Sequence, residues 1–504
     1  MFQQEDNRVK AKRENYAVEI RNQSRLAIFN QKRNQFASQA TLYKYVPENF
    51  LESIPEAEIQ VFITEKLLNP NNQLPYVLEG LKILNEKRKQ LKIYKLLQPK
   101  LLELITPFVG VLSSKEEYLS YLVFYHLLNI IYYLDQSQLL LFYNMSGFKE
   151  LYIYIKDSTF DFIRQEKLEV AAFGLFTIAN ILSEKALVLK HPFILQSYQQ
   201  FLIDLAILQQ NIQTNPTVNF IHGLMWVLRN LSQLSNNIYC QFFDILQMNI
   251  TFIEKFQINN NDISFQICQD FLQGLSTITR HMTEDEISEL FATHVQLLIF
   301  LISNPWDPKV HLEQAEVLRN LLYGQDDVIE QLLSLGLSEV IIKLMSSTNQ
   351  EVIEETIGCI RNIFGAEDEE LITQFLNQQQ LPIIKDLLYR CTGANKLEVR
   401  NEAFGAIQVL LTNYQESAEI VIKFGGIEIL INSLNDTVGQ TEIVNNILSS
   451  LYQLLSFDSS INLDQVKQLI QSCQGEQIIS QFLDSNDELT RTLAFKLIGF
   501  INLE

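Results

Sequence analysis

The sequence contains few of the residues that interrupt helices. Its 504 residues include only 17 glycines and 11 prolines, whereas leucine, isoleucine, glutamine and glutamate dominate. This composition favours long helices joined by short turns. With 47% apolar and 19% charged residues, the chain can bury an extensive interior, so we expect most of it to fold.

Cysteine is scarce, and the usual catalytic and metal-binding patterns are missing. The five cysteines lie far apart and form no CxxC pair, which predicts reduced thiols in the core. The six histidines show no HExxH or paired ligand spacing, and no GxxxxGK[ST], GxGxxG or GxSxG motif occurs. We therefore expect no enzyme activity, no cofactor and no metal site.

Long apolar runs are also missing. The most apolar stretch, residues 118–134, is interrupted by His126 and Asn129, and the N-terminus is charged from Glu5 onward. These features indicate neither secretion nor membrane insertion, so we expect a cytosolic or nuclear protein. Beyond ~250 to 300 residues a chain divides into domains or extends as a repeat array. No linker in the sequence favours a division.

Charge is distributed unevenly along the chain. Residues 1–36 contain eight Lys/Arg and four Asp/Glu, a net charge of +4, and the whole chain carries −20, so the remainder carries −24. A basic arm on an acidic body favours a cationic partner, or the arm itself, and argues against nucleic acid as the main ligand of the body. The alternative is that the acidity only keeps a large protein soluble.

One pattern recurs from about residue 73 onward. A turn, often with glycine, precedes an apolar helix, a polar break and a second helix that ends in Asn-Leu or Asn-Ile; the clearest copies begin at Gly336 and Gly425. Aligning the second helices on this asparagine gives separations of 51, 50, 49, 41, 42 and 47 residues along the following column: Asn129, Asn180, Asn230, Thr279, Asn320, Asn362 and Val409. Such a period predicts stacked units of two or three helices.

An aromatic residue stands four positions before each of the first three asparagines, and the pairs are Tyr125 with Asn129, Phe176 with Asn180 and Trp226 with Asn230. This spacing puts ring and amide on the same helix face. An Asn amide can bond the backbone of an extended peptide, and rings can hold the stems of Lys and Arg. The alternative, which the sequence leaves open, is that the rings are core and the asparagines cap helices.

Residues 226–230 read WVLRN, which resembles the W-x-x-x-N motif of the armadillo-repeat importin-α adaptors, and VLRNLLYG and CIRNIFG resemble later copies. In that family the Trp and Asn residues grip a nuclear localisation signal. The resemblance implies an all-α fold, a right-handed superhelical armadillo solenoid of about ten repeats over residues 73–504. By the same resemblance, residues 1–40 are a flexible basic arm, and residues 41–72 are a linker with a first helix.

Residues 18–34, VEIRNQSRLAIFNQKRN, resemble the importin-β-binding segment of the family, and a basic group precedes them. The resemblance assigns importin-β binding and autoinhibition to Arg13, Arg21, Arg25, Lys32 and Arg33. Importin-β would wrap the segment, and the unbound segment would fold back with Lys32 and Arg33 in the signal site. Gln31 before this pair predicts weaker inhibition. A disordered basic tail is the alternative.

The resemblance carries over to the first three Asn repeats with two changes. Tyr125 and Phe176 stand where the family has tryptophan, which predicts shallower slots and a smaller cation–π contribution. Glu184, four residues after Asn180, matches the acidic position that family members use for the key lysine. The expected major signal-binding site is Tyr125, Asn129, Phe176, Asn180, Glu184, Trp226 and Asn230.

The minor signal-binding site of the family matches this sequence poorly. Its tryptophan positions read Glu316, Gly358 and Gly405. The first is not normally aromatic in the family, but the loss of the other two removes the slots for basic side chains, although Asn320 and Asn362 remain. We expect a weak minor site and a preference for signals with one basic cluster.

The expected function is a nuclear import adaptor that binds basic nuclear localisation signals, links cargo to importin-β, and shuttles between cytoplasm and nucleus. The resemblance leaves open an export receptor at the C-terminal repeats, near Phe495. The alternative is an armadillo scaffold with no transport role. Trp306, which lies between Pro305 and Pro308, is interpreted as part of a structural loop rather than an exposed partner-binding residue.

Overall fold

The computed structural model describes residues 61–68, 73–87, 116–234, 239–257, 262–323, 326–378, 382–437, 439–456 and 463–502, with residues 58, 105, 108 and 111–113. Every regular element within these ranges is a helix. The expected arm over residues 1–40 and most of residues 41–72 lie outside the described residues. The arm residues Arg13, Arg21, Arg25, Lys32 and Arg33 therefore remain sequence predictions.

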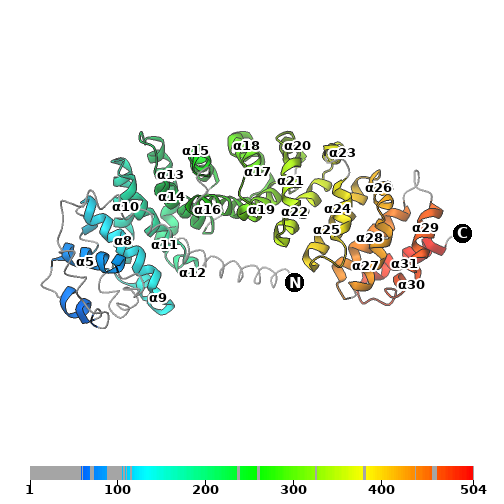
Figure 1. Cartoon of the computed structure of the whole chain (residues 1–504), viewed down its shortest axis with the longest axis horizontal. Coiled ribbons are helices and arrows are strands. Elements are labelled where there is room, and N and C mark those ends of the chain that lie inside the picture. The colour runs from blue at the N-terminus through cyan, green and yellow to red at the C-terminus, as the bar shows by residue number, and fades with distance from the viewer. Residues whose placement is uncertain are drawn as a thin grey trace. The chain divides into compact units, whose positions relative to one another are not determined.

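The chain divides into two compact units, with the boundary in the sequence between Ile278 and Thr279. The described part of unit 1 includes a π-helical turn, η3 (Phe62–Leu67). Its α-helices (Figure 1) are α5 (Leu74–Lys87), α8 (Glu117–Tyr133), α9 (Gln136–Asn144), α10 (Phe148–Arg164), α11 (Leu168–Leu182), α12 (Lys185–Val188), α13 (Pro192–Gln210), α14 (Val218–Ser232), α15 (Tyr239–Gln257) and α16 (Asp262–Thr279).

Unit 2 continues the same helical pattern. A short 3₁₀ helix, η6 (Pro308–Val310), precedes its first long helix. Its α-helices (Figure 1) are α17 (Glu284–Thr293), α18 (Val295–Ser303), α19 (His311–Leu321), α20 (Asp326–Ser334), α21 (Leu337–Met345), α22 (Gln350–Phe364), α23 (Glu369–Gln378), α24 (Pro382–Arg390), α25 (Leu397–Asn413), α26 (Ser417–Lys423), α27 (Gly426–Asp436), α28 (Thr441–Ser456), α29 (Leu463–Ser472), α30 (Gly475–Ser480) and α31 (Glu488–Asn502).

Local sequence explains where several helices begin. Asp135 and Gln138 form a capping box at the start of α9, as Thr283 and Glu286 do for α17, so backbone N–H groups that lack helical partners are satisfied. The recurring glycine has a backbone reason. Gly336 precedes α21 with a φ of +99°, a left-handed conformation that residues with a Cβ rarely adopt.

The core of each unit is built on the last helix of every repeat, which we call the third helix. In unit 1 these are α8, α11, α14 and α16, and in unit 2 they are α19, α22, α25, α28 and α31. Helix α11 packs against both α8 and α14, and all of its residues except Glu169 are buried. A helix that is apolar on every side needs such neighbours. The predicted all-α repeat fold is confirmed.

Trp306 belongs to the core of unit 2. The indole is buried, its Nε1–H donates to the carbonyl oxygen of Leu301 at 2.9 Å, and its ring meets Phe300 edge to face with centroids 5.0 Å apart. The interpretation as a structural loop is therefore confirmed.

The described cysteines form no disulfide. Cys268, Cys359 and Cys391 are buried, and Cys473 is half-buried. Burial raises the pKa of the Cys359 and Cys391 thiols, which keeps them protonated. The side chain of Cys240 lies outside the described residues.

Among the described helices, none is by itself long and apolar enough to cross a membrane. Helices α17 and α18 reach that length and composition only as a pair, and they are bent by 89° where they meet.

Candidate peptide-binding site

The residues expected to form the major site lie together on three adjacent third helices of unit 1. Tyr125 and Asn129 are on α8, Phe176 and Asn180 on α11, and Trp226 and Asn230 on α14, and α11 packs between the other two helices. The structure therefore brings together three aromatic–Asn pairs that are about 50 residues apart in sequence.

The aromatic side chains form a continuous row across these helices. Tyr121 meets Phe173 edge to face at 4.9 Å between ring centroids, which joins α8 to α11. Phe176 lies 6.0 Å from Trp226 and 5.3 Å from His222, which joins α11 to α14. Edge-to-face and tilted contacts at these distances are favourable. The rings therefore pack against one another along the row.

These rings are buried in the folded chain. Tyr125 is 2% exposed, Phe176 1% and Trp226 8%, and the three asparagines are also buried. The sequence left open whether aromatics at this spacing form slots for a ligand or part of the core. In the folded chain they contribute to the core of unit 1, so a ligand that used them would need a change in their surroundings.

The asparagines hold successive third helices together. Asn180 donates its Nδ2–H to the carbonyl oxygen of Leu128 at 3.2 Å, and Asn230 donates to that of Ala179 at 2.7 Å. In both cases the acceptor is the residue before the preceding asparagine of the column. Asn129, by contrast, donates to Tyr125 on its own helix. Since an Asn amide has two N–H groups and an acceptor oxygen, each of these bonds uses one donor.

A buried ion pair lies beside Trp226. Arg229 donates from Nη1 to Oδ1 of Asp270 on α16 at 2.7 Å, and His222 Nε2 lies 3.7 Å from the other carboxylate oxygen. Burial lowers the pKa of His222, and the Asp270 carboxylate opposes this shift. The imidazole stacks on Trp226 at 25° between ring planes, with centroids 6.4 Å apart.

Sequence reasoning missed these arginine contacts, although a signal for them was present. Within the asparagine column, arginine precedes asparagine at Arg229, Arg319 and Arg361. Each of these arginines pairs with a carboxylate on a later third helix. An Arg–Asn step at a column position therefore accompanies an inter-repeat ion pair.

Glu184 is half-buried and lies just before α12, close to the end of α11. The role of Glu184 as the acceptor of a ligand lysine stays a prediction from the sequence.

The residues of the expected minor site lie on α19 and α22 of unit 2. Asn320 donates to the hydroxyl of Thr279 at 3.2 Å, and Asn362 donates to the carbonyl oxygen of Arg319 at 2.9 Å. Both side chains are half-buried. The bond of Asn362 repeats the pattern of unit 1, whereas Glu316 and Gly358 stand one turn earlier on α19 and α22 instead of aromatic residues.

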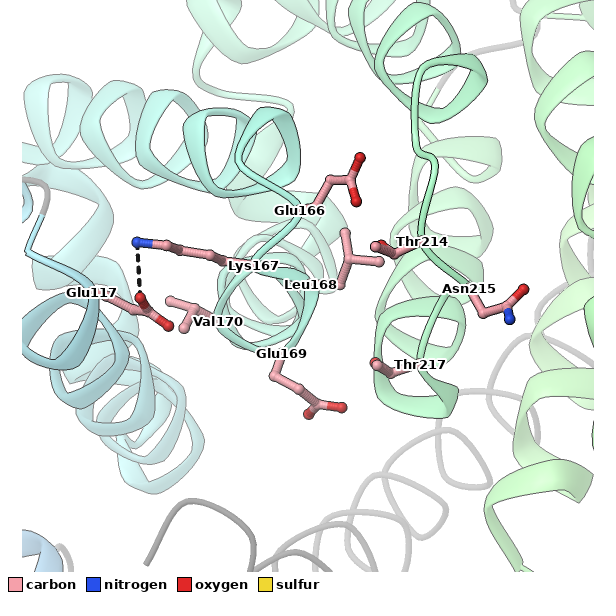
Figure 2. A pocket seen from close by; sticks show the side chains of 9 residues that line it. All are labelled: Glu117, Glu166, Lys167, Leu168, Glu169, Val170, Thr214, Asn215 and Thr217. Carbon is pink, nitrogen blue, oxygen red and sulfur yellow. Dashed lines mark ion pairs between the residues drawn. The ribbon is translucent and has the colours of Figure 1, made fainter. Parts of the chain in front are cut away.

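A cavity of about 390 Å³ lies where α11 and α14 begin (Figure 2). Lys167 bridges to Glu117 with 2.8 Å between Nζ and Oε2, and Asn219 donates to Glu169 at 3.0 Å. The ionic groups at this cavity therefore link neighbouring repeats. Its lining includes no residue of the expected sites and consists of Glu117, Glu166, Lys167, Leu168, Glu169, Val170, Thr214, Asn215 and Thr217. Within the described ranges, no cluster of His, Cys, Asp or Glu could hold a metal ion.

Comparison with known proteins identifies the fold. No family model matches the sequence, and no curated protein matches it. An engineered protein of known crystal structure is 17% identical, with a TM-score of 0.61 over 88% of this chain and 99% of that chain. The fold is armadillo-repeat-like.

Two designed armadillo repeat proteins also match, each over 50% of this chain. One is 19% identical with a TM-score of 0.42 and is covered over its full length. The other, solved in complex with the peptide (KR)4, is 21% identical with a TM-score of 0.41 and is covered over 99% of its length.

Proposed function

We propose that unit 1 binds an extended basic segment of a partner protein along α8, α11 and α14. The observation that carries this proposal is the register of the three aromatic–Asn pairs on adjacent third helices. Amides repeated at helix spacing can bond a peptide backbone, and a row of rings can accept cationic side chains. The charge of −24 outside the basic arm favours a cationic ligand.

The burial of the rings adds a requirement to this proposal. Because Phe176 is 1% and Trp226 8% exposed, a peptide reaches them only if their surroundings rearrange. Binding that needs a rearrangement has a reduced apparent affinity, by the fraction of chains in the open form. We therefore expect slow association, and tighter binding whenever the open form is favoured.

As the wider role of this site, we propose a nuclear import adaptor. The basic segment over residues 18–34 would bind importin-β, and the body would carry cargo with a single basic cluster. An adaptor of this kind shuttles between cytoplasm and nucleus and needs an export receptor, for which the C-terminal repeats are the proposed contact. The support is the resemblance of this segment and the opposite charges of arm and body.

A labelled (KR)4 peptide, titrated against the full chain, tests the binding site. Asn180→Ala with Asn230→Ala should weaken binding about ten- to a hundredfold, because two amide bonds to the peptide are lost. The chain without residues 1–40 should bind more tightly if the arm competes. Asn144→Ala with Asn211→Ala is the matched control, since these exposed asparagines bond only within their own helices. If neither change altered the affinity, the proposed site would be wrong.

The second candidate function is an armadillo scaffold without a transport role. The use of the asparagines in inter-helix bonds and the burial of the rings favour it. A pull-down with importin-β separates the two functions. The adaptor predicts that the full chain binds importin-β and that Arg21→Glu with Arg25→Glu weakens this binding strongly, whereas the scaffold predicts no binding by either protein.

A further inference from the structure

Two arginines cross the third helices of unit 2, and we call them the arginine strap: Arg319 on α19 and Arg361 on α22. Arg319 donates from Nη1 to Glu355 on α22 at 3.3 Å and from Nη2 to Glu402 on α25 at 3.0 Å. Nη1 of Arg361 lies 3.7 Å from the other oxygen of Glu402. Arg319 therefore spans α22 and connects three successive third helices.

Glycines make this crossing possible. A Cβ added to Gly358 would lie 2.5 Å from Nε of Arg319, and one added to Gly405 would lie 3.2 Å from Cζ of Arg361. Glycine inside a helix costs about 1 kcal/mol relative to alanine, so its presence in α22 and α25 needs a reason. The reason here is space, because each glycine admits the arginine of the preceding third helix.

The strap lies among a surplus of carboxylates. Burial on its own lowers the pKa of Arg319, but Glu402 and Glu355 outweigh it and raise the pKa overall. Burial, together with the carboxylates of Glu355, Glu402 and Glu398, raises the pKa of the neighbouring Glu354 to about 7, although Arg319 opposes this shift. The surface formed by these carboxylates thus attracts cations. The cationic groups beside Glu355 and Glu402 are Arg319 and Arg361 of the chain itself.

We propose that Arg319 and Arg361 are specificity-determining residues that occupy the cation sites of unit 2 from within the chain and thereby exclude basic peptides from α22 and α25. That the excluded peptide is basic rests on the proposed function. That α22 and α25 are blocked rests on the geometry of the strap. An arginine attached to the protein competes at high effective concentration with one supplied by a ligand. Unit 2 therefore resists basic peptides although it carries the carboxylates to bind them.

Binding of labelled (KR)4 to the full chain tests the strap in two backgrounds, the unaltered chain and the chain with Asn180→Ala and Asn230→Ala. Arg319→Gln with Arg361→Gln removes the strap and leaves Glu355 and Glu402. Gly358→Ala displaces Arg319 without changing any charge. When either strap variant is made in the otherwise unaltered chain, we expect that chain to bind a second peptide. When it is made in the background with Asn180→Ala and Asn230→Ala, we expect the peptide to bind about tenfold or more tightly.

The matched control removes two arginines outside the third helices, Arg164→Gln with Arg390→Gln; each lies within 4 Å of an aspartate on its own helix, and this variant should add no second peptide. Tryptophan fluorescence, to which Trp226 of unit 1 and Trp306 of unit 2 contribute, verifies that the variants remain folded. If a folded strap variant gained no binding in either background, the strap proposal would be wrong. Binding by the strap variants but not by the unaltered chain would support the strap and contradict the proposed site in unit 1. A gain in the control variant would attribute the effect to net charge and also overturn the strap.

Discussion

The third helices of the two units share one bond and differ in what surrounds it. In unit 1, Asn180 donates to the carbonyl oxygen of Leu128, and in unit 2, Asn362 donates to that of Arg319. Four residues before the asparagine, unit 1 has Phe176 and unit 2 has Gly358. This bond is therefore common to both units, whereas the residue one turn earlier differs.

This difference changes what holds the helices together. Buried rings and one enclosed ion pair connect α8, α11, α14 and α16 in unit 1. Half-exposed carboxylates and guanidinium groups connect α19, α22 and α25 in unit 2. Burial of apolar surface contributes more to stability than partly exposed ion pairs do. We therefore expect substitutions in the row of unit 1 to cost more than equivalent ones in unit 2.

The largest expected effect is that of Phe176→Ala. The ring is 1% exposed and packs against Trp226 and His222, so its removal should leave a cavity and cost about 3 to 5 kcal/mol. Urea unfolding of unit 1 can be followed through Trp226 fluorescence in a Trp306→Phe background, because the chain has only these two tryptophans. Leu141→Ala, at a side chain of unit 1 that is 58% exposed, is the control and should cost less than about 0.5 kcal/mol. A cost below about 1 kcal/mol for Phe176→Ala would identify the ring as a ligand slot rather than core.

The repeat pattern predicted much of the fold from sequence. The period of the asparagine column, with glycine turns such as those at Gly336 and Gly425, predicted the helices α21, α22, α27 and α28 correctly. Periodicity records which residues share a helix face. It does not record whether that face meets another helix or a ligand, so the burial of Phe176 and Trp226 could not be predicted from spacing.

The candidate site was predictable only in part for a related reason. An Asn amide can bond a peptide or a neighbouring helix, and both uses require the same spacing. The strap involves Arg319 and Glu402, which are 83 residues apart. A single sequence does not show that residues so far apart are in contact. The glycines inside α22 and α25 were the available signal, because a glycine inside a helix can mark the close approach of another part of the chain.

A smaller effect is expected for Asn230→Ala. This substitution removes the bond to Ala179 and leaves its buried carbonyl oxygen without that donor, which should cost about 1 to 3 kcal/mol in unit 1. Asn211→Ala, at an exposed residue that bonds within its own helix, should cost less than about 0.5 kcal/mol. Trp226 fluorescence in the same background measures both. Equal costs for the two variants would show that the amide column does not stabilise the stack.

The last effect concerns pH, because the stability of the two units is expected to change with pH in opposite directions. Burial and neighbouring carboxylates raise the pKa of Glu354 from 4.5 to about 7. Between these values the folded state holds a proton that the unfolded state releases, so the contribution of Glu354 to the stability of unit 2 falls as pH rises. The glutamine of the Glu354→Gln variant does not titrate. The unfolding free energy of the variant minus that of the unaltered chain should therefore increase from pH 5 to pH 8.

Trp306 fluorescence in a Trp226→Phe background measures this difference. Unit 1 supplies the contrast, because burial lowers the pKa of His126 to about 3. The unfolded histidine binds a proton near its ordinary value of 6.5 while the folded one remains neutral, so this group lowers the stability of unit 1 as pH falls. Glu354→Gln should leave that dependence unchanged. Parallel pH profiles for unit 2 with and without Glu354→Gln would mean that Glu354 ionises in the folded state as it does in the unfolded chain.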